Sequence, residues 1–171
     1  MPNADNDDWR QATPLGTLRF AEEYCQVAEG GLERHRSRLP ENQRHHTLVP
    51  FPIYFNYLHS IELALKAYML HTGSGLQELR PPGGVGHNLN ASLGACIERS
   101  LRDHCPELSD MLIEVITESD EMYKKKDFEY IRQGDVTLQH IDQIALAANA
   151  LLSGLRTLQM LPVRPDQQPV L

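Results

Sequence analysis

The sequence predicts an all-α protein, a single-domain antiparallel up-and-down helical bundle of about five helices. Apolar residues recur at spacings of three and four in five segments, prolines and glycines separate these segments, and none shows convincing strand alternation. The chain has 171 residues, of which 41% are hydrophobic, so it can bury the core of one domain. Short connectors between consecutive helices favour antiparallel packing of neighbours.

The first predicted helix covers residues 14–37. Thr13 suits the N-cap position, and Pro14 fits the first helical position because no N–H is needed there. The apolar face of this helix consists of Leu18, Ala21, Tyr24, Ala28 and Leu32. Residues 1–12 are polar and rich in Asp and Asn, so we expect a disordered N-terminal segment before a helical bundle at 13–161.

The second predicted helix is the most apolar segment of the chain. It begins at Pro52 and ends before Gly73, a residue type that often follows the last turn of a helix. Apolar residues cover most of its circumference, which predicts a central helix with neighbours on several sides. These residues are Ile53, Tyr57, Ile61, Ala64, Leu65, Tyr68 and Met69.

Three polar residues, His59, Glu62 and Lys66, follow one stripe of this apolar helix. Glu62 precedes Lys66 by four positions, the favourable order for an ion pair within a helix. Two interpretations are open. Either the stripe is a partly exposed polar edge, or it meets His87 in a polar pocket that binds a nucleotide or a phosphate.

The second half of the chain supplies the rest of the bundle. In chain order we expect a connector at 73–86 with one helical turn at 75–79, a helix at 88–102, a helix at 106–125, an extended segment at 127–135, a helix at 138–161 and a flexible tail at 162–171. His87-Asn88, Pro106 and Thr137 mark the three helix starts. The helix at 106–125 is expected to bury Leu108, Met111, Leu112, Val115 and Met122.

Charge is unevenly distributed along the chain. A net charge of -7 disfavours indiscriminate binding of polyanions. A local basic cluster nevertheless precedes the second helix, and it consists of Arg34, Arg36, Arg38 and Arg44. Arginine pairs well with phosphate, so this cluster is a candidate contact for an RNA backbone, with a solvated helix end and loop as the alternative.

The fourth helix has an acidic outer face. Its carboxylates recur at spacings of three and four, at Glu107, Asp110, Glu114, Glu118 and Glu121. This pattern is typical of a solvated helix surface. It also argues against RNA lying along that side.

Several protein classes are disfavoured by what the sequence lacks. The N-terminus has no apolar signal segment, and no stretch approaches the roughly 20 apolar residues that span a bilayer, so we expect a cytoplasmic protein without a membrane partner. Three cysteines without a CxxC pair suit reduced thiols. HExxH, P-loop and GxGxxG motifs are missing, so no metal and no cofactor is expected.

Three segments resemble the HEPN domain (higher eukaryotes and prokaryotes nucleotide-binding): "HSIELALKAYMLHTG", "GHNLNASLGACIERSL" and "DFEYIRQGDVTLQHIDQIALAANALL". The resemblance covers roughly residues 50–155. It implies an all-α bundle, often a homodimer, that binds RNA or a nucleotide. Many members are metal-independent RNases or toxins of toxin–antitoxin systems, sometimes beside a nucleotidyltransferase-type partner protein. Others are inactive binding domains.

The resemblance also implies a place for a catalytic pair. Active members carry an arginine, usually a polar residue after it, and a histidine four to six residues later near the start of the last long helix. Here "YIRQGDVTLQH" supplies Arg132 and His140, with seven residues between them, a wider gap than the family pattern. The fallback pair is Arg99 and His104 in "RSLRDH". In either pair the arginine would stabilise charge on the phosphate, and the histidine would move a proton.

The sequence thus leaves three functions open. The first is a HEPN-like RNA- or nucleotide-binding protein, acting as a metal-independent endoribonuclease where it is catalytic. The second is a non-catalytic dimeric protein-interaction or regulatory module. The third is a protein with a small-molecule pocket between its helices.

Overall fold

The structure is a computed structural model of the whole chain, and it describes residues 12–44, 48–125 and 138–158. Four earlier expectations lie outside these residues almost entirely: the disordered segment at 1–12, the extended segment at 127–135, the cap at Thr137 and the tail at 162–171. Over the residues that are described, the secondary structure is helical without a strand. The predicted all-α bundle is therefore confirmed.

The described part of the chain contains six α-helices and two short 3₁₀ helices. In chain order these are α1 (Pro14–Ser37), η2 (Glu41–Gln43), α2 (Phe51–His71), η3 (Leu76–Leu79), α3 (Leu89–Glu98), α4 (Leu101–His104), α5 (Asp110–Lys124) and α6 (Ile141–Thr157). Helix α4 is a single turn, so five long helices form the bundle, as the sequence predicts.

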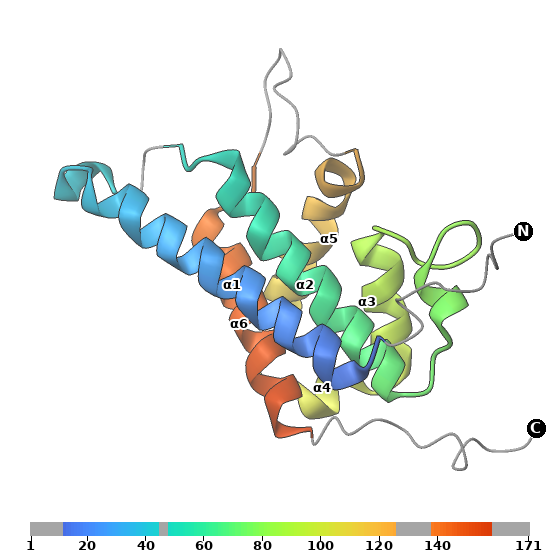
Figure 1. Cartoon of the computed structure of the whole chain (residues 1–171). Coiled ribbons are helices and arrows are strands. Elements are labelled where there is room, and N and C mark those ends of the chain that lie inside the picture. Colours follow the sequence, from blue (N-terminus) through green and yellow to red (C-terminus); the bar gives the residue numbers. More distant parts are fainter. Residues whose placement is uncertain (1–11, 45–47, 126–137, 159–171) are drawn as a thin grey trace, which may run out of the picture.

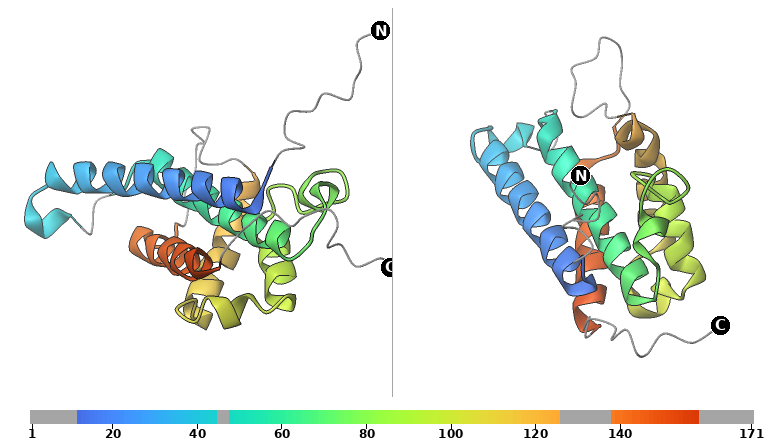
Figure 2. Two further views of the ribbon diagram at one scale, coloured as in Figure 1. Left: turned by 60° about the horizontal axis from the view of Figure 1, so that its bottom comes forward. Right: turned by 45° about the vertical axis from the view of Figure 1, so that its right-hand side comes forward.

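Helix α2 is the central element of the fold. It packs along α1 and also contacts α3, α5 and α6. Figure 2 shows α1 and α2 side by side as one layer, with α6 against it from below. Several large side chains of α2, among them Tyr57, Leu58, Ile61, Leu65 and Tyr68, are almost completely buried. The all-round apolar pattern therefore predicted the place of this helix correctly.

The boundaries of the first two helices follow their capping residues. The side chain of Thr13 accepts a hydrogen bond from the backbone N–H of Gly16 at 3.0 Å, and Pro14 is the first helical residue. Gly73 follows the C-cap Thr72 with a φ of +94°, a conformation that glycine adopts without a Cβ clash. The local signals decided these boundaries: the predicted start of α1 and end of α2 are confirmed, and α2 starts at Phe51, one residue before the predicted Pro52.

The third predicted helix, 88–102, is wrong over its last four residues. Asn88 is the N-cap, because its side chain accepts from the N–H of Ala91 at 2.9 Å. The helix ends at Glu98, and Ser100 adopts a left-handed conformation with a φ of +65°. The hydroxyl of Tyr68 donates to the freed carbonyl of Arg99 at 2.5 Å. The chain turns here, and α4 follows as a separate helix.

The last two predicted helices are both too long. Ser109, and not Pro106, caps the helix that was expected at 106–125, so α5 starts at Asp110. Met111 is 51% exposed, because the buried face of α5 passes through Leu112, Val115 and Ile116 instead. The helix expected at 138–161 starts after the N-cap His140 and ends at Thr157, where Leu158 becomes extended.

The helices have no membrane-spanning character where the structure describes them. None combines the length and the apolar composition that crossing a bilayer requires.

Candidate functional site

The structure brings the predicted polar stripe of α2 together with His87. Glu62 lies at the centre with a side chain only 1% exposed, and it accepts hydrogen bonds from the Lys66 ammonium and the Tyr123 hydroxyl. Nδ1 of His87, on the connector before α3, lies 3.1 and 3.2 Å from the two carboxylate oxygens. The interpretation of the stripe as an exposed edge is therefore wrong for Glu62.

His59 belongs to the same network. Its Nδ1 lies 2.8 Å from the Tyr123 hydroxyl and 3.4 Å from Oε2 of Glu62. The ring is packed edge-on against Tyr24 and stacked on Phe55, at centroid distances of 4.4 and 5.5 Å. Tyr123, from α5, is a member that the sequence did not indicate, because nothing local to α5 shows which helix it faces.

The network holds an ionised carboxylate inside the bundle. Burial alone would raise the pKa of Glu62, but the hydrogen bond with His59 and the charge of Lys66 hold it well below its usual range. With Lys66, Tyr123, His87 and His59 around it, the carboxylate has its acceptor positions occupied. We therefore infer that this cluster holds α2, α5 and the connector together and is not a ligand pocket.

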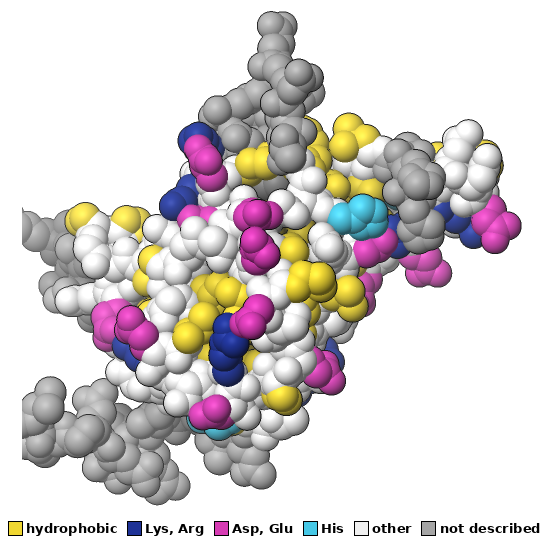
Figure 3. All heavy atoms as spheres, turned by 180° about the vertical axis from the view of Figure 1, so that it is seen from behind, with side chains coloured by type: hydrophobic (Ala, Val, Ile, Leu, Met, Phe, Trp, Pro, Cys, Tyr) yellow, Lys and Arg dark blue, Asp and Glu magenta, His cyan; other side chains and the backbone are white. Residues whose placement is uncertain are grey.

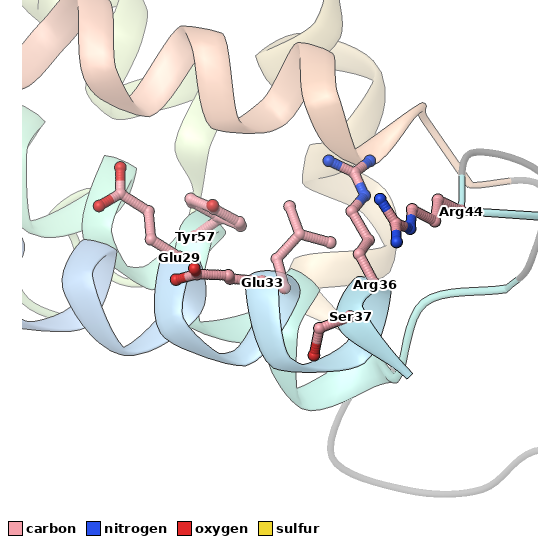
Figure 4. Close-up of a pocket in the computed structure, with 7 residues that line it drawn as sticks. Glu29, Glu33, Arg36, Ser37, Arg44 and Tyr57 are labelled. Atoms are coloured by element: carbon pink, nitrogen blue, oxygen red, sulfur yellow. The ribbon is translucent and has the colours of Figure 1, made fainter. Parts of the chain in front are cut away.

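Two residues of the predicted basic cluster, Arg36 and Arg44, line an open cavity of about 680 Å³. It lies along the C-terminal half of α1, next to α2 and the α1–α2 connector (Figure 4). Its lining residues are Glu29, Leu32, Glu33, Arg36, Ser37, Arg44 and Tyr57. The volume lies within the range of roughly 300–1,000 Å³ that is usual for small-molecule sites.

Two arginines come together at one end of this cavity. Figure 4 shows the guanidinium groups of Arg36 and Arg44 close to each other, Arg36 from α1 and Arg44 from the end of η2. Nε of Arg44 donates to the carbonyl of Leu39 at 3.3 Å. Of the four arginines predicted as a phosphate contact, the other two, Arg34 and Arg38, are exposed and do not line the cavity.

Arg36 also connects the cavity to the start of α6. One of its terminal nitrogens lies 2.8 and 2.9 Å from the two carboxylate oxygens of Asp142. Its Nε is buried and has no hydrogen-bond partner among the described residues. A guanidinium has five N–H donors, so the ion pair with Asp142 leaves others for a further acceptor.

His140 lies beside that ion pair. It is the N-cap of α6, and its Nδ1 is 3.4 Å from the backbone N of Asp142 and 3.6 Å from Oδ2 of the same residue. A neutral ring accepts from the N–H, and a protonated ring pairs with the carboxylate, so both protonation states have a partner. The structure therefore joins His140 and Arg36, which are 104 positions apart in the sequence, through Asp142.

The two predicted catalytic pairs have different outcomes. Arg132 lies outside the described residues, so its distance from His140 is not defined. Arg99 donates to the Ser74 hydroxyl at 2.6 Å and pairs with Glu78 at 3.2 Å. His104 instead faces Tyr68 and lines a separate cavity of about 350 Å³ between α4 and α6. In the described part of the chain, no hydrogen bond or ring contact joins Arg99 to His104.

The opposite end of the main cavity is acidic. Glu29 accepts from the side-chain amide of Asn149 at 3.1 Å, and the Cys25 thiol lies 3.8 Å from the same oxygen. Glu33, one turn further along α1, makes no ion pair with any residue that the structure describes. Tyr57 lies between the two ends, and burial raises its phenol pKa above the usual range. The phenol is therefore neutral.

A cysteine nucleophile and a metal site both have little support in the described residues. The three cysteines are buried, and burial raises the pKa of Cys25 to about 11, of Cys96 to about 12 and of Cys105 to about 11. Such thiols are weak nucleophiles, because the thiolate is the reactive form. Nowhere in the described ranges do three potential metal ligands of the His, Cys, Asp or Glu type gather.

Comparison with protein-family models, with curated proteins and with solved structures gives no match to this chain. The candidate site therefore rests on the residues and their geometry.

The sequence contained a partial signal for this cavity. Glu29, Glu33 and Arg36 are spaced four and three apart, so they share one face of the correctly predicted first helix. Asp142 follows His140 by two positions at the expected start of the last helix. The packing of α1 against α6 was not predictable, because it depends on tertiary contacts between segments more than 100 residues apart.

Proposed function

We propose that this chain is a HEPN-like protein that binds RNA or a nucleotide, with a phosphate group held by Arg36 and Arg44. One observation carries the proposal: the two guanidinium groups lie close together at the end of an open cavity. Two positive charges at one end of a cavity favour an anion beside them. Asp142 supplies one anion to Arg36, and a phosphate would supply a second that both arginines reach.

The donor geometry suits this ligand. Arginine presents a planar set of N–H groups that matches the oxygens of a phosphate, and charge-assisted bonds of this kind are strong. The buried Nε of Arg36 has no acceptor among the described residues, and a buried donor without a partner is unfavourable. The remaining N–H groups of the guanidinium are the donors that a phosphate in the cavity would use.

The charge of the remaining surface favours contact with a few phosphates over an extended RNA-binding surface. The five acidic residues predicted on the outer face of the fourth helix, Glu107, Asp110, Glu114, Glu118 and Glu121, are all exposed. The face of the molecule in Figure 3 carries several acidic side chains among apolar ones and few basic ones. We therefore propose contact with a few phosphates only, which predicts a shallow dependence of affinity on salt.

If the chain cleaves RNA, we propose that His140 accepts the proton of a ribose 2′-hydroxyl and that Arg132 stabilises the charge on the phosphorus oxygens. The side chain of His140 is 51% exposed, so a substrate can approach it. Its location beside the Arg36–Asp142 pair would put the reacting phosphate next to the arginine end of the cavity. The reaction needs no metal ion in this scheme.

Binding is tested with a labelled single-stranded RNA in EDTA at low salt. Arg44→Ala is expected to weaken binding about tenfold, because a charge-assisted contact to phosphate is lost. It is also expected to reduce the slope of log Kd against log salt by about one. Arg36→Lys keeps a charge opposite Asp142 and removes the Nε donor, so it is expected to weaken binding without unfolding the protein.

Arg102→Ala is the matched control. Arg102 is an exposed arginine that pairs with Asp110 at 2.6 Å, away from the cavity. It should leave RNA affinity unchanged. Equal affinities for wild type, Arg44→Ala and Arg102→Ala would rule out the arginine end of the cavity as the phosphate site.

Catalysis is tested separately by incubating a structured RNA with the protein in EDTA. We expect cleavage by wild type and its loss in Arg132→Ala/His140→Ala, measured as the rate of product formation. Arg99→Ala is expected to retain activity, because its side chain is engaged with Ser74 and Glu78. Cleavage that disappears only in Arg99→Ala would move the site to the α3–α4 turn, and no cleavage by wild type would leave a binding protein.

A second candidate function is the dimeric interaction or regulatory module. The observation that favours it lies on α1, where Phe20 is 59% and Val27 is 61% exposed. These residues are seven positions apart, so they share one face of the helix. Two large exposed apolar side chains on one face suit a contact with a second copy or with a partner such as a nucleotidyltransferase-type protein. A monomer that captures no partner would contradict this candidate.

A further inference from the structure

The cavity is polarised along α1. Arg36 and Arg44 lie at one end, and Glu29 and Glu33 lie toward the other (Figure 4). A simple anion would use only the arginine end and would be repelled by the two carboxylates. A ligand that fits the whole cavity therefore carries an anionic group at one end and hydrogen-bond donors at the other.

The spacing of the two ends suits a mononucleotide. Glu29 and Arg36 are seven residues apart on α1, which corresponds to about 10 Å along the helix axis. That is comparable with the separation between the phosphate and the far edge of the base in an extended nucleoside monophosphate. Glu33 is only three residues from Arg36, but Figure 4 shows its side chain extended along α1 toward Glu29, so its carboxylate lies toward the acidic end of this span. Between the ends, Leu32 and Tyr57 supply an apolar floor for the sugar and the body of the base.

The two carboxylates are not equivalent. Glu29 is held in place by Asn149, and one of its oxygens accepts from that amide. Glu33 makes no ion pair or hydrogen bond with any described residue, so both of its oxygens are available. An ionised carboxylate only accepts hydrogen bonds, so it selects a ligand edge that donates two of them.

We propose that this cavity recognises a guanine nucleotide, with the phosphate on Arg36 and Arg44 and the base edge on Glu33. The assignment rests on the proposed function, because it uses the same phosphate site. Guanine presents two adjacent donors, N1–H and the N2 amino group, which one carboxylate can accept together. Adenine offers its amino group beside an unprotonated ring nitrogen, whose lone pair would face the carboxylate and be repelled.

Glu29 then lies where a second acceptor is useful. The guanine amino group has two hydrogens, and a carboxylate one turn along the helix can accept the one that Glu33 does not. Hypoxanthine retains N1–H and lacks the amino group. A hypoxanthine nucleotide therefore tests the contribution of the amino group separately from that of N1–H.

The experiment is calorimetric titration of the full chain with GMP, IMP and AMP. We expect GMP to bind about tenfold more tightly than IMP, and IMP more tightly than AMP, because each step removes a hydrogen bond to a charged acceptor. Glu33→Gln is expected to lower the affinity for GMP about tenfold and to leave AMP binding unchanged. Glu33 is exposed, so this variant should fold normally.

Glu23→Gln is the matched control, because Glu23 is an exposed glutamate of the same helix outside the cavity. It should bind all three nucleotides like wild type. Equal affinities for GMP and AMP that are both lost in Arg44→Ala would overturn the guanine assignment and leave the phosphate site standing. Failure of every nucleotide and of RNA to bind would overturn the proposed function itself.

Discussion

Glu62 combines almost complete burial with a full negative charge. Its side chain is 1% exposed, and it is stabilised by Lys66, Tyr123, His87 and His59. A buried ion pair of this kind contributes little compared with an apolar pair of equal volume, but removing one partner leaves the other uncompensated. Replacing Glu62 would therefore remove the common partner of side chains from α2, α5 and the connector.

We expect Glu62→Gln to lower the free energy of unfolding by about 3 kcal/mol, because Lys66 would be left partly buried without its counter-charge. Chemical denaturation monitored by circular dichroism measures this. Glu121→Gln is the control: it removes the same charge from an i,i+4 pair with Lys125 at the surface, and little change is expected there. Equal losses in the two variants would show that the buried network is not what stabilises the bundle.

The same residue predicts a pH dependence. The pKa of Glu62 is lowered in the folded protein, so its stabilisation is fully present above the unfolded pKa of about 4.3 and is lost as the pH falls. Unfolding free energy measured between pH 7 and pH 3 should therefore decline for wild type more steeply than for Glu62→Gln. Parallel profiles for the two proteins would contradict a depressed pKa at this position.

At the scale of elements, α6 approaches α4 and its following loop very closely at Gly154. A Cβ built at this glycine would lie 2.5 Å from Sγ of Cys105 and 2.6 Å from the carbonyl oxygen of His104. Besides the Cys105 side chain, two of the three nearest atoms are backbone, the His104 carbonyl oxygen and Cα of Cys105 at 2.8 Å, and backbone yields less readily than a flexible side chain. The glycine is thus required by the packing of two elements, despite its poor helix propensity.

We expect Gly154→Ala to destabilise the protein by about 1–3 kcal/mol, because the two elements must move apart. Gly94 provides a matched control inside α3, where an added Cβ meets nothing within 4 Å. Gly94→Ala should instead stabilise the protein by up to about 1 kcal/mol through helix propensity. Thermal unfolding of both variants measures the contrast, and two shifts of the same sign would contradict the close approach.

The elements also show what the sequence could predict. The bounds of α1 and α2 followed from Thr13, Pro14 and Gly73, because capping and turn preferences act over three or four residues. The break at Ser100 did not follow, because a left-handed serine has no local signal and depends on the hydroxyl of Tyr68 reaching the Arg99 carbonyl. Local signals thus predicted which segments are helical, whereas the end of the helix before α4 depends on a tertiary contact.

At the scale of the whole molecule, the candidate site depends on which helices meet. The sequence grouped Arg36 and Arg44 as neighbours in a basic cluster, and it placed His140 at the start of the last helix. It could not show that Arg36 reaches Asp142 or that Glu62 meets Tyr123, because these contacts join positions 106 and 61 residues apart. Spatial neighbours of this kind are set by how α1, α2, α5 and α6 pack.

The packing also leaves one long face of α1 without a neighbour in the described chain. Phe20 and Val27 project from it, while the opposite face of α1 is buried against α2 and α6. Association of two copies through this face would remove both side chains from water, at roughly 25 cal/mol for each Å² of apolar surface buried. We propose on this basis a homodimer with α1 of each chain at its interface.

We expect wild type to have twice the mass of one chain in light-scattering measurements at micromolar concentration, and Phe20→Ser/Val27→Ser to have the mass of a monomer. Both residues are already exposed in a single chain, so the double variant should retain the helical circular dichroism signal. Met111→Ser, at a 51% exposed site on α5, changes apolar surface elsewhere and should leave the dimer intact. A wild type that is monomeric throughout, or a double variant that still dimerises, would exclude this face of α1 as the interface.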